Sequence, residues 1–355
     1  MRVAAAGPVV IVGGGLAGSL LALALRELGV AVTLLDAAPA AAAASATAIS
    51  YGAIPGWPLG TTPLARLAAG ASRRWRRLQR RHGPLGWRSA RLRLHGPGLS
   101  SLLPLPLAQV DTAVFMGRLP LVLQAAGVEQ LPLAVRQLQP DTSGRWQLSL
   151  SDGRSLACQR VVLAAGAACR DLWPTAPDRL RSSWAAVLEL PDYPLAAAEG
   201  TCWLPRVFQR SALERGAAQL QQPRWLVDAG LVPRSAGALL GQLSLVRPDP
   251  APGPVPLAAE SEQRLRQGLA ADPWAAPLAY RPGVLQQAAV AFCSDGVPLV
   301  GPLAAGIWAF TGFSAGFSQV PVLAPLLARC LTAAPDDRAA QAQLQRLGVW
   351  PTPAA

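Results

Sequence analysis

The sequence predicts an α/β fold joined to an α+β part: a Rossmann-like dinucleotide-binding domain interleaved with a domain built on an antiparallel sheet. Three observations predict it. Residues 9–36 carry a βαβ pattern with spaced glycines, and residues 180–290 hold strand-like runs separated by Pro and Gly. Between them, an apolar run that ends in glycine at 161–166 is typical of a strand returning to the first domain, so the two parts alternate along the chain.

The chain opens with a dinucleotide-binding fingerprint. Gly13, Gly15 and Gly18 form G-x-G-x-x-G between an apolar run and a helical pattern that stops at Gly29. In this motif the first glycine permits the tight turn, the second lets the backbone approach a pyrophosphate, and the third allows close helix packing. The free N–H groups and the dipole at the helix start then attract the diphosphate. The alternative is a glycine-rich turn in an ordinary helix–strand pair.

Asp36 ends the second apolar run, 18 residues after Gly18. We expect its carboxylate to accept hydrogen bonds from ribose hydroxyls. A 2′-phosphate would be repelled, which argues against NADP, but FAD and NAD both stay open. No second G-x-G-x-x-G follows a later strand, so one dinucleotide is expected.

Four segments carry a family resemblance. They are SATA at 45–48, VVLAAGA at 161–167, CSDGVPLVG at 293–301 and TGFSAG at 311–316. In this order they resemble the FAD-dependent D-amino-acid oxidase superfamily, whose members include glycine and sarcosine oxidases. The resemblance implies FAD as cofactor, and an oxidoreductase that oxidises a C–N bond of a small amine or amino acid by hydride transfer to flavin N5.

The fingerprint and these segments together give the expected FAD-binding residues. These are Gly13, Gly15, Leu16, Ala17, Gly18, Asp36, Ser45, Thr47, Val135, Ala165, Gly166, Asp295, Gly312, Phe313, Ser314, Ala315 and Gly316. For Val135 the resemblance implies a backbone contact with the adenine. The turn ending at Gly316 is expected to open a helix whose N-terminus stabilises negative charge on the reduced flavin; the alternative is a packing role alone.

Fewer residues can be assigned to the substrate-binding part of the site. The catalytic candidates are Arg281, Tyr280 and Tyr51. In amino-acid-oxidising relatives an arginine shortly before the D-G-x-P box binds the carboxylate, and Arg281 holds a similar place. It lies 14 residues before Asp295, farther than in close relatives, so a structural or surface arginine is the alternative. Tyr280 and Tyr51 are candidates for lining the pocket, against the more common packing role.

The expected domains are discontinuous. Residues 1–60, 108–175 and 290–355 are assigned to the FAD-binding domain, and residues 61–107 and 176–289 to the substrate domain.

Local patterns predict individual elements. Residues 64–82 have the spacing of one basic amphipathic helix, 111–126 of a helix stopped by Gly127, and 257–270 of another helix. The Asp-Gly pair within 151–154 predicts a β-hairpin.

Composition limits the function classes. The net charge is +12, and all 32 residues of the Lys+Arg total are arginine. A genome-wide preference for arginine is the simpler interpretation, and the dense run at 73–82 is interpreted as a solvated helix face rather than a phosphate track. Without lysine, Schiff-base and PLP chemistry are excluded. Five cysteines and two histidines without ligand spacing predict no metal site.

Partners and location follow from the same features. A small amine or amino-acid substrate is expected, with O₂ or a quinone as electron acceptor and nucleic acid not expected. The odd cysteine count and the lack of a membrane-spanning stretch predict a cytoplasmic enzyme without a transmembrane segment. Two alternatives stay open: a flavin enzyme acting on a modified tRNA base, and a non-catalytic dinucleotide-binding interaction protein.

Overall fold

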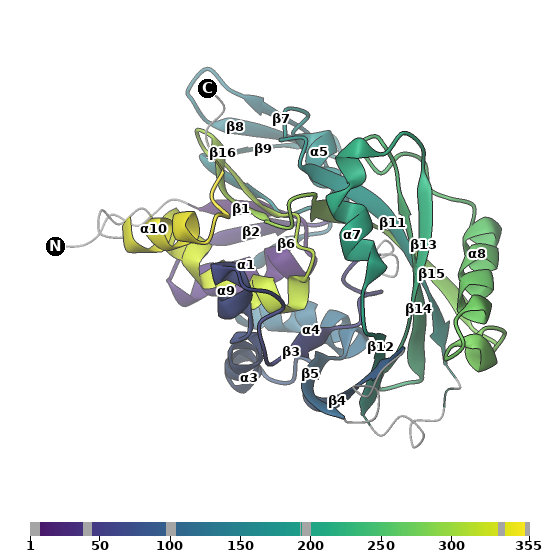
Figure 1. The fold of residues 1–355 in the computed structure, drawn as a ribbon. Coiled ribbons are helices and arrows are strands. Elements are labelled where there is room, and N and C mark those ends of the chain that lie inside the picture. The colour runs from purple at the N-terminus through teal and green to yellow at the C-terminus, as the bar shows by residue number, and fades with distance from the viewer. Residues whose placement is uncertain are drawn as a thin grey trace.

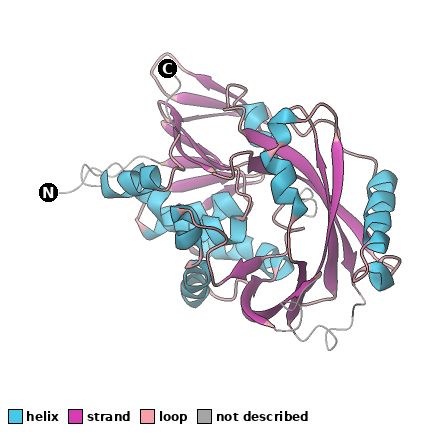
Figure 2. Ribbon diagram, in the orientation of Figure 1, coloured by secondary structure: helices cyan, strands magenta, loops and turns pink. Residues whose placement is uncertain are grey.

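The computed structural model describes residues 8–37, 45–96, 104–191, 193, 200–332 and 338–351. A mainly parallel sheet and a curled antiparallel sheet dominate the arrangement (Figure 1). Helices gather on one face of the first sheet, and one helix lies alone on the outer face of the second (Figure 2). The expected fold class, a Rossmann-like part beside an antiparallel sheet, is confirmed.

The first sheet has six strands. In spatial order they are β16 (Leu299–Ala304), β17 (Ile307–Thr311), β10 (Arg160–Leu163), β1 (Val9–Val12), β2 (Val32–Leu35) and β6 (Glu129–Leu131). All neighbours pair in parallel except β16 and β17. The second sheet has eight strands, in the order β15 (Val284–Cys293), β11 (Leu180–Leu190), β14 (Ala238–Val246), β13 (Arg224–Pro233), β12 (Thr201–Pro205), β4 (Trp87–His95), β5 (Leu105–Val110) and β3 (Ala53–Pro55). Its pairs are antiparallel except for β12 with β4. A small third sheet holds β7 (Val135–Pro140), β8 (Trp146–Leu150) and β9 (Ser155–Cys158).

The helices complete the two layers. They are α1 (Leu16–Glu27), α2 (Pro63–Ala68), α3 (Ala71–His82), α4 (Thr112–Ala125), α5 (Cys169–Leu172), α7 (Gln209–Arg215), α8 (Ala258–Ala271), α9 (Gly316–Leu331) and α10 (Arg338–Arg346). Short 3₁₀ turns cover Gly166–Ala168, Ala217–Gln219 and Ala276–Leu278.

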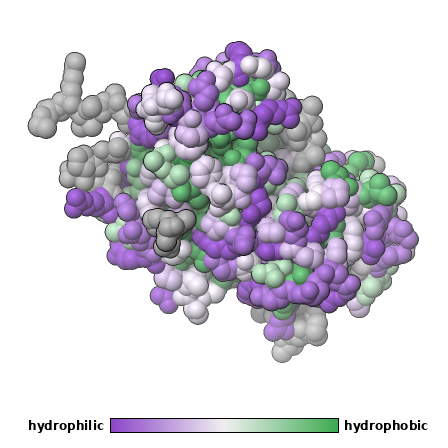
Figure 3. Space-filling view, turned by 90° about the horizontal axis from the view of Figure 1, so that it is seen from above, coloured by the Kyte–Doolittle hydropathy of each residue, from purple (hydrophilic) through white to green (hydrophobic). Residues whose placement is uncertain are grey.

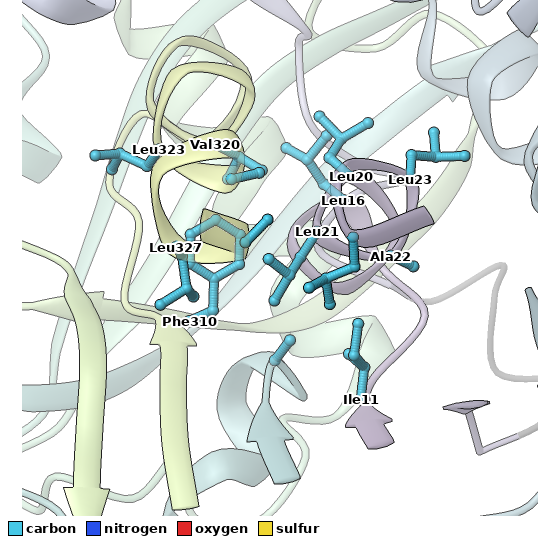
Figure 4. Close-up of a cluster of buried hydrophobic side chains, with 14 of the residues drawn as sticks. Ile11, Leu16, Leu20, Leu21, Ala22, Leu23, Phe310, Val320, Leu323 and Leu327 are labelled. Atoms are coloured by element: carbon cyan, nitrogen blue, oxygen red, sulfur yellow. The ribbon is translucent and has the colours of Figure 1, made fainter. Parts of the chain in front are cut away.

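The parallel sheet is buried on both faces, and alternate residues of β1 show why. Val9 and Ile11 belong to the core beneath α1, α4 and α9, whereas Val10 and Val12 face the core shared with β8 and β9. Figure 4 shows α1 and α9 side by side above the strands, with Ile11 and Phe310 under them. Each such buried aliphatic side chain contributes about 1.5–3 kcal/mol through removal from water.

The antiparallel sheet separates its faces in the same way. Leu188 and Leu240 pack with Leu265 and Leu269 of α8 on the outer face. Val187, one position earlier in β11, turns to the inner face and belongs to another core. The sheet therefore uses one face for stability and leaves the other for a cavity. On the molecular surface seen from above, hydrophobic residues form small groups among hydrophilic ones (Figure 3).

Several elements match their expected bounds closely. The helices expected at 111–126 and 257–270 appear as α4 and α8, and β8 and β9 form the expected hairpin. Asp111 caps α4 by accepting hydrogen bonds from two backbone N–H groups at 3.1 and 3.3 Å.

The single helix expected across 64–82 is wrong; the structure has two helices, α2 and α3. The backbone N–H of Gly70 donates to the Leu67 carbonyl at 3.0 Å, an i→i+3 bond that ends α2. Glycine is a poor helix former, so the break is easy at this position. After the break, the buried Trp75 packs on Phe115 and Phe317 and donates from its indole nitrogen to the Phe317 carbonyl at 2.8 Å.

Trp75 thus lies in the helical core above the parallel sheet, although residues 61–107 were assigned to the substrate domain. The sequence-derived domain boundaries remain a proposal. Within the described ranges no helix has the length and hydrophobicity to cross a membrane. The same part of the chain holds no group of three or more His, Cys, Asp or Glu that could bind a metal.

Candidate active site

A cavity of about 1760 Å³ lies between the two large sheets. Its lining includes the residues that directly follow β1, β2, β10 and β17, which are the carboxyl ends of four parallel strands. Ligands of open α/β sheets bind at this edge. The volume exceeds the ~300–1,000 Å³ of an ordinary small-ligand pocket, so it suits a large cofactor together with a substrate.

Almost all expected cofactor residues line this one cavity. They are Gly13, Gly15, Leu16, Ala17, Asp36, Ser45, Thr47, Val135, Ala165, Gly166, Asp295, Gly312, Phe313, Ser314, Ala315 and Gly316. Gly18 lies beneath it. A Cβ on Gly18 would come within 1.9 Å of the Gly13 carbonyl oxygen, so this glycine lets α1 lie close against the turn.

The start of α1 forms a narrow cradle with the loop at 45–50. The backbone N–H of Leu16 donates to Thr47 Oγ1 at 3.1 Å. A Cβ on Gly15 would lie 3.2 Å from that oxygen and would project into the space between helix and loop. No side chain caps α1, so the remaining N–H groups of its first turn face the cavity end where a diphosphate fits.

Asp36 lies against the glycine turn at the same end. A Cβ on Gly14 would meet the Asp36 carboxylate at 2.6 Å, so only glycine leaves room for it. Asp36 Oδ1 accepts from the Ala37 N–H at 3.1 Å, and Oδ2 has no hydrogen-bond partner among the described residues. The carboxylate is exposed and open to a ligand hydroxyl.

Asp295 shapes the D-G-V-P turn at the opposite side. Its Oδ1 accepts from the Val297 N–H at 3.0 Å, and its Oδ2 pairs with Arg179 at 3.0 Å. These two contacts hold the D-G-V-P turn in place, so the Asp295 carboxylate has a structural role beside the cavity.

The turn at 312–316 leads into α9 and lines the middle of the cavity. Gly312 has a φ of 79°, and a Cβ there would meet the Cys293 sulfur at 2.5 Å. α9 has no side-chain cap, so its first N–H groups are directed at the cavity. Burial raises the pKa of the Cys293 thiol to about 12, which keeps it protonated at neutral pH.

The inner face of the antiparallel sheet forms an apolar wall. Its members are Leu92 and Leu94 of β4, Leu105 and Leu107 of β5, Val187 of β11 and Leu204 of β12. This wall gives the substrate end a preference for apolar groups.

Arg210 of α7 lies at the edge of this wall. Asp228 of β13 accepts from the backbone N–H groups of Gln209 and Arg210 at 2.9 and 3.0 Å and so fixes the start of α7. The Arg210 guanidinium lies 3.4 Å from Glu214 Oε1 and 3.5 Å from the Ser314 carbonyl oxygen. Its Nε is buried without a hydrogen-bond partner in the described chain.

Further polar atoms in the cavity lining lack a hydrogen-bond partner among the described residues, and they include the Tyr51 hydroxyl and Gln287 Oε1. Buried polar groups are normally hydrogen-bonded, so these atoms indicate a ligand. Burial, reinforced by Asp228, raises the pKa of Tyr51 far above its ordinary value, so the phenol stays protonated and can donate.

Comparison with known proteins agrees with this geometry. The model of the DAO family, described as FAD dependent oxidoreductase, matches residues 8–102. These residues belong to a DAO-family FAD-dependent oxidoreductase domain. The resemblance seen in the sequence is confirmed over these residues. No curated protein matches the chain by sequence.

Solved structures share the fold of this chain over nearly its whole length. Glycine oxidase from Geobacillus kaustophilus has a TM-score of 0.65 and 18% identity, covering 91% of this chain and 94% of its own. Iminodiacetate oxidase from Chelativorans sp. BNC1 has a TM-score of 0.62 and 17% identity, with coverages of 91% and 94%. L-proline dehydrogenase from P. horikoshii has a TM-score of 0.65 and 12% identity, with coverages of 93% and 94%.

The cavity fits the FAD that the DAO family uses. The open helix starts of α1 and α9, the Gly15–Thr47 cradle and the free oxygen of Asp36 are all directed into it. Asp36 and Val135 mark the expected adenosine end, and residues 312–316 the expected flavin end.

The expected catalytic residues divide into two groups. Tyr51 lines the cavity, whereas neither Tyr280 nor Arg281 does. Tyr280 is 73% exposed, and the Arg281 guanidinium lies 5.5 Å from the centre of the Tyr193 ring. Arg281 precedes β15 and is absent from the cavity lining, so this geometry does not support it as the carboxylate clamp.

Neither Arg210 nor Gln287 was predicted from the sequence. Arg210 could not stand out in a chain where arginine is so frequent. One signal was present: Asp228 interrupts an apolar strand, and a carboxylate at such a position needs partners in the fold. Those partners are the N–H groups of α7, the helix that carries Arg210.

Proposed function

We propose that this enzyme oxidises a C–N bond of an amine or amino acid that carries an apolar side chain. One observation supports it above all: a single cavity joins the fingerprint, the turn before α9 and the leucine-rich wall, with Arg210 at the edge of that wall. FAD, when bound, supplies the acceptor for the hydride of the substrate C–H bond.

Arg210 is proposed to bind the substrate carboxylate. A guanidinium forms charge-assisted, often bidentate, hydrogen bonds with carboxylates, and the buried Arg210 Nε is free to donate. Burial raises the pKa of Glu214, so this neighbour only partly compensates the arginine charge. The positive charge of Arg210 thereby remains available to the substrate.

The side chains around the substrate are proposed to position it rather than to take its proton. The Tyr51 phenol remains neutral because burial raises its pKa, so it acts as a hydrogen-bond donor. Gln287 Oε1 can accept from a substrate amine. Hydride transfer depends more on an oriented substrate and on the exclusion of water than on a strong base. Hydrogen bonds from Tyr51 and to Gln287 would supply that orientation.

The test is an anaerobic titration of the FAD-loaded enzyme, followed by the loss of flavin absorbance. Amino acids with leucine-like or aromatic side chains should bleach the flavin at lower concentration than glycine does. The amines that lack only the carboxylate should bleach it at higher concentration than their parent amino acids. Failure of every amine and amino acid to bleach a flavin that dithionite reduces would refute the proposal.

A further inference from the structure

A second hollow borders α2 and α3. It measures about 510 Å³ and is lined by Arg66, Arg73, Arg74, Arg77, Arg80, Leu67, Gly70 and Val322. We call it the arginine groove. It brings five guanidinium groups from α2 and α3 together beside α9.

The charge of the arginine groove is not compensated by the chain. Elsewhere, exposed arginines pair with carboxylates, as Arg145 does with Asp141 at 3.4 Å and Arg264 with Glu260 at 3.0 Å. Among the described residues, none of the five groove guanidiniums has an ion pair or a hydrogen bond. A general preference for arginine codons explains how many arginines there are, but not why the carboxylates are missing here.

Folding does not require these arginines. Only Ala71 and Trp75 of α3 are buried, so the arginines contribute nothing to the core. Arg73 and Arg74 lie in the first turn of α3, where positive charge interacts unfavourably with the helix dipole. Mutual repulsion adds to this cost, and an external polyanion would relieve both.

The arginine groove adjoins the entrance of the cavity. Leu59 and Val255 line the cavity and are 64% and 61% exposed, which marks its opening to solvent. Leu64 and Ala68 of α2 line the cavity, while Arg66 of the same helix lines the groove. α2 is only six residues long, about 9 Å at the usual helical rise. Leu59 precedes α2 by four residues, so an exposed leucine and the groove arginine Arg66 are close along the chain at the entrance.

We propose that this face docks on an anionic lipid bilayer, with the groove arginines at the lipid phosphates and Leu59 at the acyl boundary. A basic cluster together with an exposed apolar side chain is typical of proteins that lie in the membrane interface. Docking turns the cavity entrance toward the lipid, from which an amphiphilic reactant can enter.

A single-stranded RNA is a poorer match for the same charge. RNA-binding grooves combine basic residues with aromatic rings on which bases stack. On α3 the ring of Trp75 is buried, and the Arg76 guanidinium lies 5.7 Å from the ring centre of nearby Trp87. The exposed apolar residue beside the groove is instead the aliphatic Leu59.

The test is cosedimentation of the FAD-loaded full chain with vesicles of phosphatidylcholine, with and without phosphatidylglycerol. The groove variant combines Arg73→Gln, Arg77→Gln and Arg80→Gln. The control combines Arg145→Gln, Arg154→Gln and Arg264→Gln, three exposed, ion-paired arginines, and changes the net charge equally. We expect the groove variant to bind anionic vesicles roughly 100-fold more weakly, and the control to bind nearly as wild type does.

A second pair of variants tests the apolar contact. Leu59→Asp should weaken binding to the anionic vesicles. Val284→Asp should not, because this exposed valine lies on β15, at the opposite edge of the antiparallel sheet from β3. Binding must also fall as salt is added, because the Debye length shortens. Three results would overturn the proposal: no preference for anionic vesicles, equal losses in the groove and control variants, or displacement from vesicles by an equimolar single-stranded RNA.

Discussion

The hydroxyl of Thr47 accepts a hydrogen bond from the backbone N–H of Leu16 at 3.1 Å, joining residues 31 positions apart. The bond attaches the hydroxyl-rich loop to the first turn of α1, directly over the glycine fingerprint. It also occupies one of the N–H groups that the fingerprint presents. We infer that Thr47 positions the loop while the neighbouring N–H groups face the diphosphate.

Arg210, and not Arg281, is predicted to bind the substrate carboxylate. Arg210→Ala should raise KM for an amino acid about 10–100-fold, the range for losing a hydrogen bond to a charged group. It should change KM for the matching amine without a carboxylate much less. Arg281→Ala is the control, since that side chain lies outside the cavity, and should leave both KM values near wild type. Steady-state kinetics on both substrates measure this, and equal effects of Arg210→Ala on the two would remove it from carboxylate binding.

The contrast between these arginines shows which parts of the site could be predicted from the sequence. Gly13, Gly15 and Gly18 act through local backbone geometry, and local geometry is encoded by spacing. The turn at 312–316 was found because resemblance supplied its place in the chain, and Tyr51 because the chain has only three tyrosines. Arg210 depends on α7 folding over the antiparallel sheet, a contact between distant segments that no local pattern encodes.

The same reasoning applies to the fold. The strands and helices with strong periodicity, such as α4 and α8, appear within a residue or so of their expected bounds. The break between α2 and α3 was missed because the polar periodicity continues across Gly70. What decides it is the burial of Trp75 against Phe317, a residue 242 positions away.

Asp36 is predicted to hold the adenosine ribose. Asp36→Ala should weaken FAD affinity by about 1–3 kcal/mol, since it removes a charged hydrogen-bond acceptor. Titration of the apoprotein with FAD, followed by flavin fluorescence, measures the change. Glu260→Ala, an exposed carboxylate on α8, is the matched control. A variant at Asp36 that binds FAD as tightly as the control would place the ribose contact elsewhere.

Tyr51 is predicted to stay protonated in the folded enzyme at every pH the fold survives. Its folded pKa is raised above the unfolded value of about 10, so the native state holds its proton longer than the unfolded state does. Stability should therefore fall as pH rises above about 10, and Tyr51→Phe should lessen that fall. In a phenolate absorbance titration, Tyr51→Phe should leave the signal of the folded enzyme unchanged. A loss of folded phenolate signal in Tyr51→Phe would show that the hydroxyl is accessible to base.

FAD is predicted to be held without a covalent bond. Cys293, the cysteine beside the D-G-V-P turn, is buried, protonated at neutral pH and packed against Gly312 rather than lining the cavity. A thiol in this state is a poor nucleophile. Acid precipitation should therefore release all of the yellow colour as FAD, and Cys293→Ser should release the same amount. Colour retained in the pellet of the wild type alone would contradict this.

The reduced enzyme is predicted to react slowly with O₂ and to pass its electrons to a quinone or another acceptor. The chain has no lysine, so no compact ammonium charge can lie beside the flavin. Arg210 brings a positive charge to this end of the cavity, but its guanidinium is bulky and delocalised and is not equivalent to a point charge. Stabilisation of the negative charge that develops on oxygen should therefore be weak. The measurement is anaerobic reduction by substrate, followed by mixing with air-saturated buffer or with a soluble quinone. Reoxidation by the quinone should outpace reoxidation by air, and reoxidation by air faster than substrate turnover would make the enzyme an oxidase.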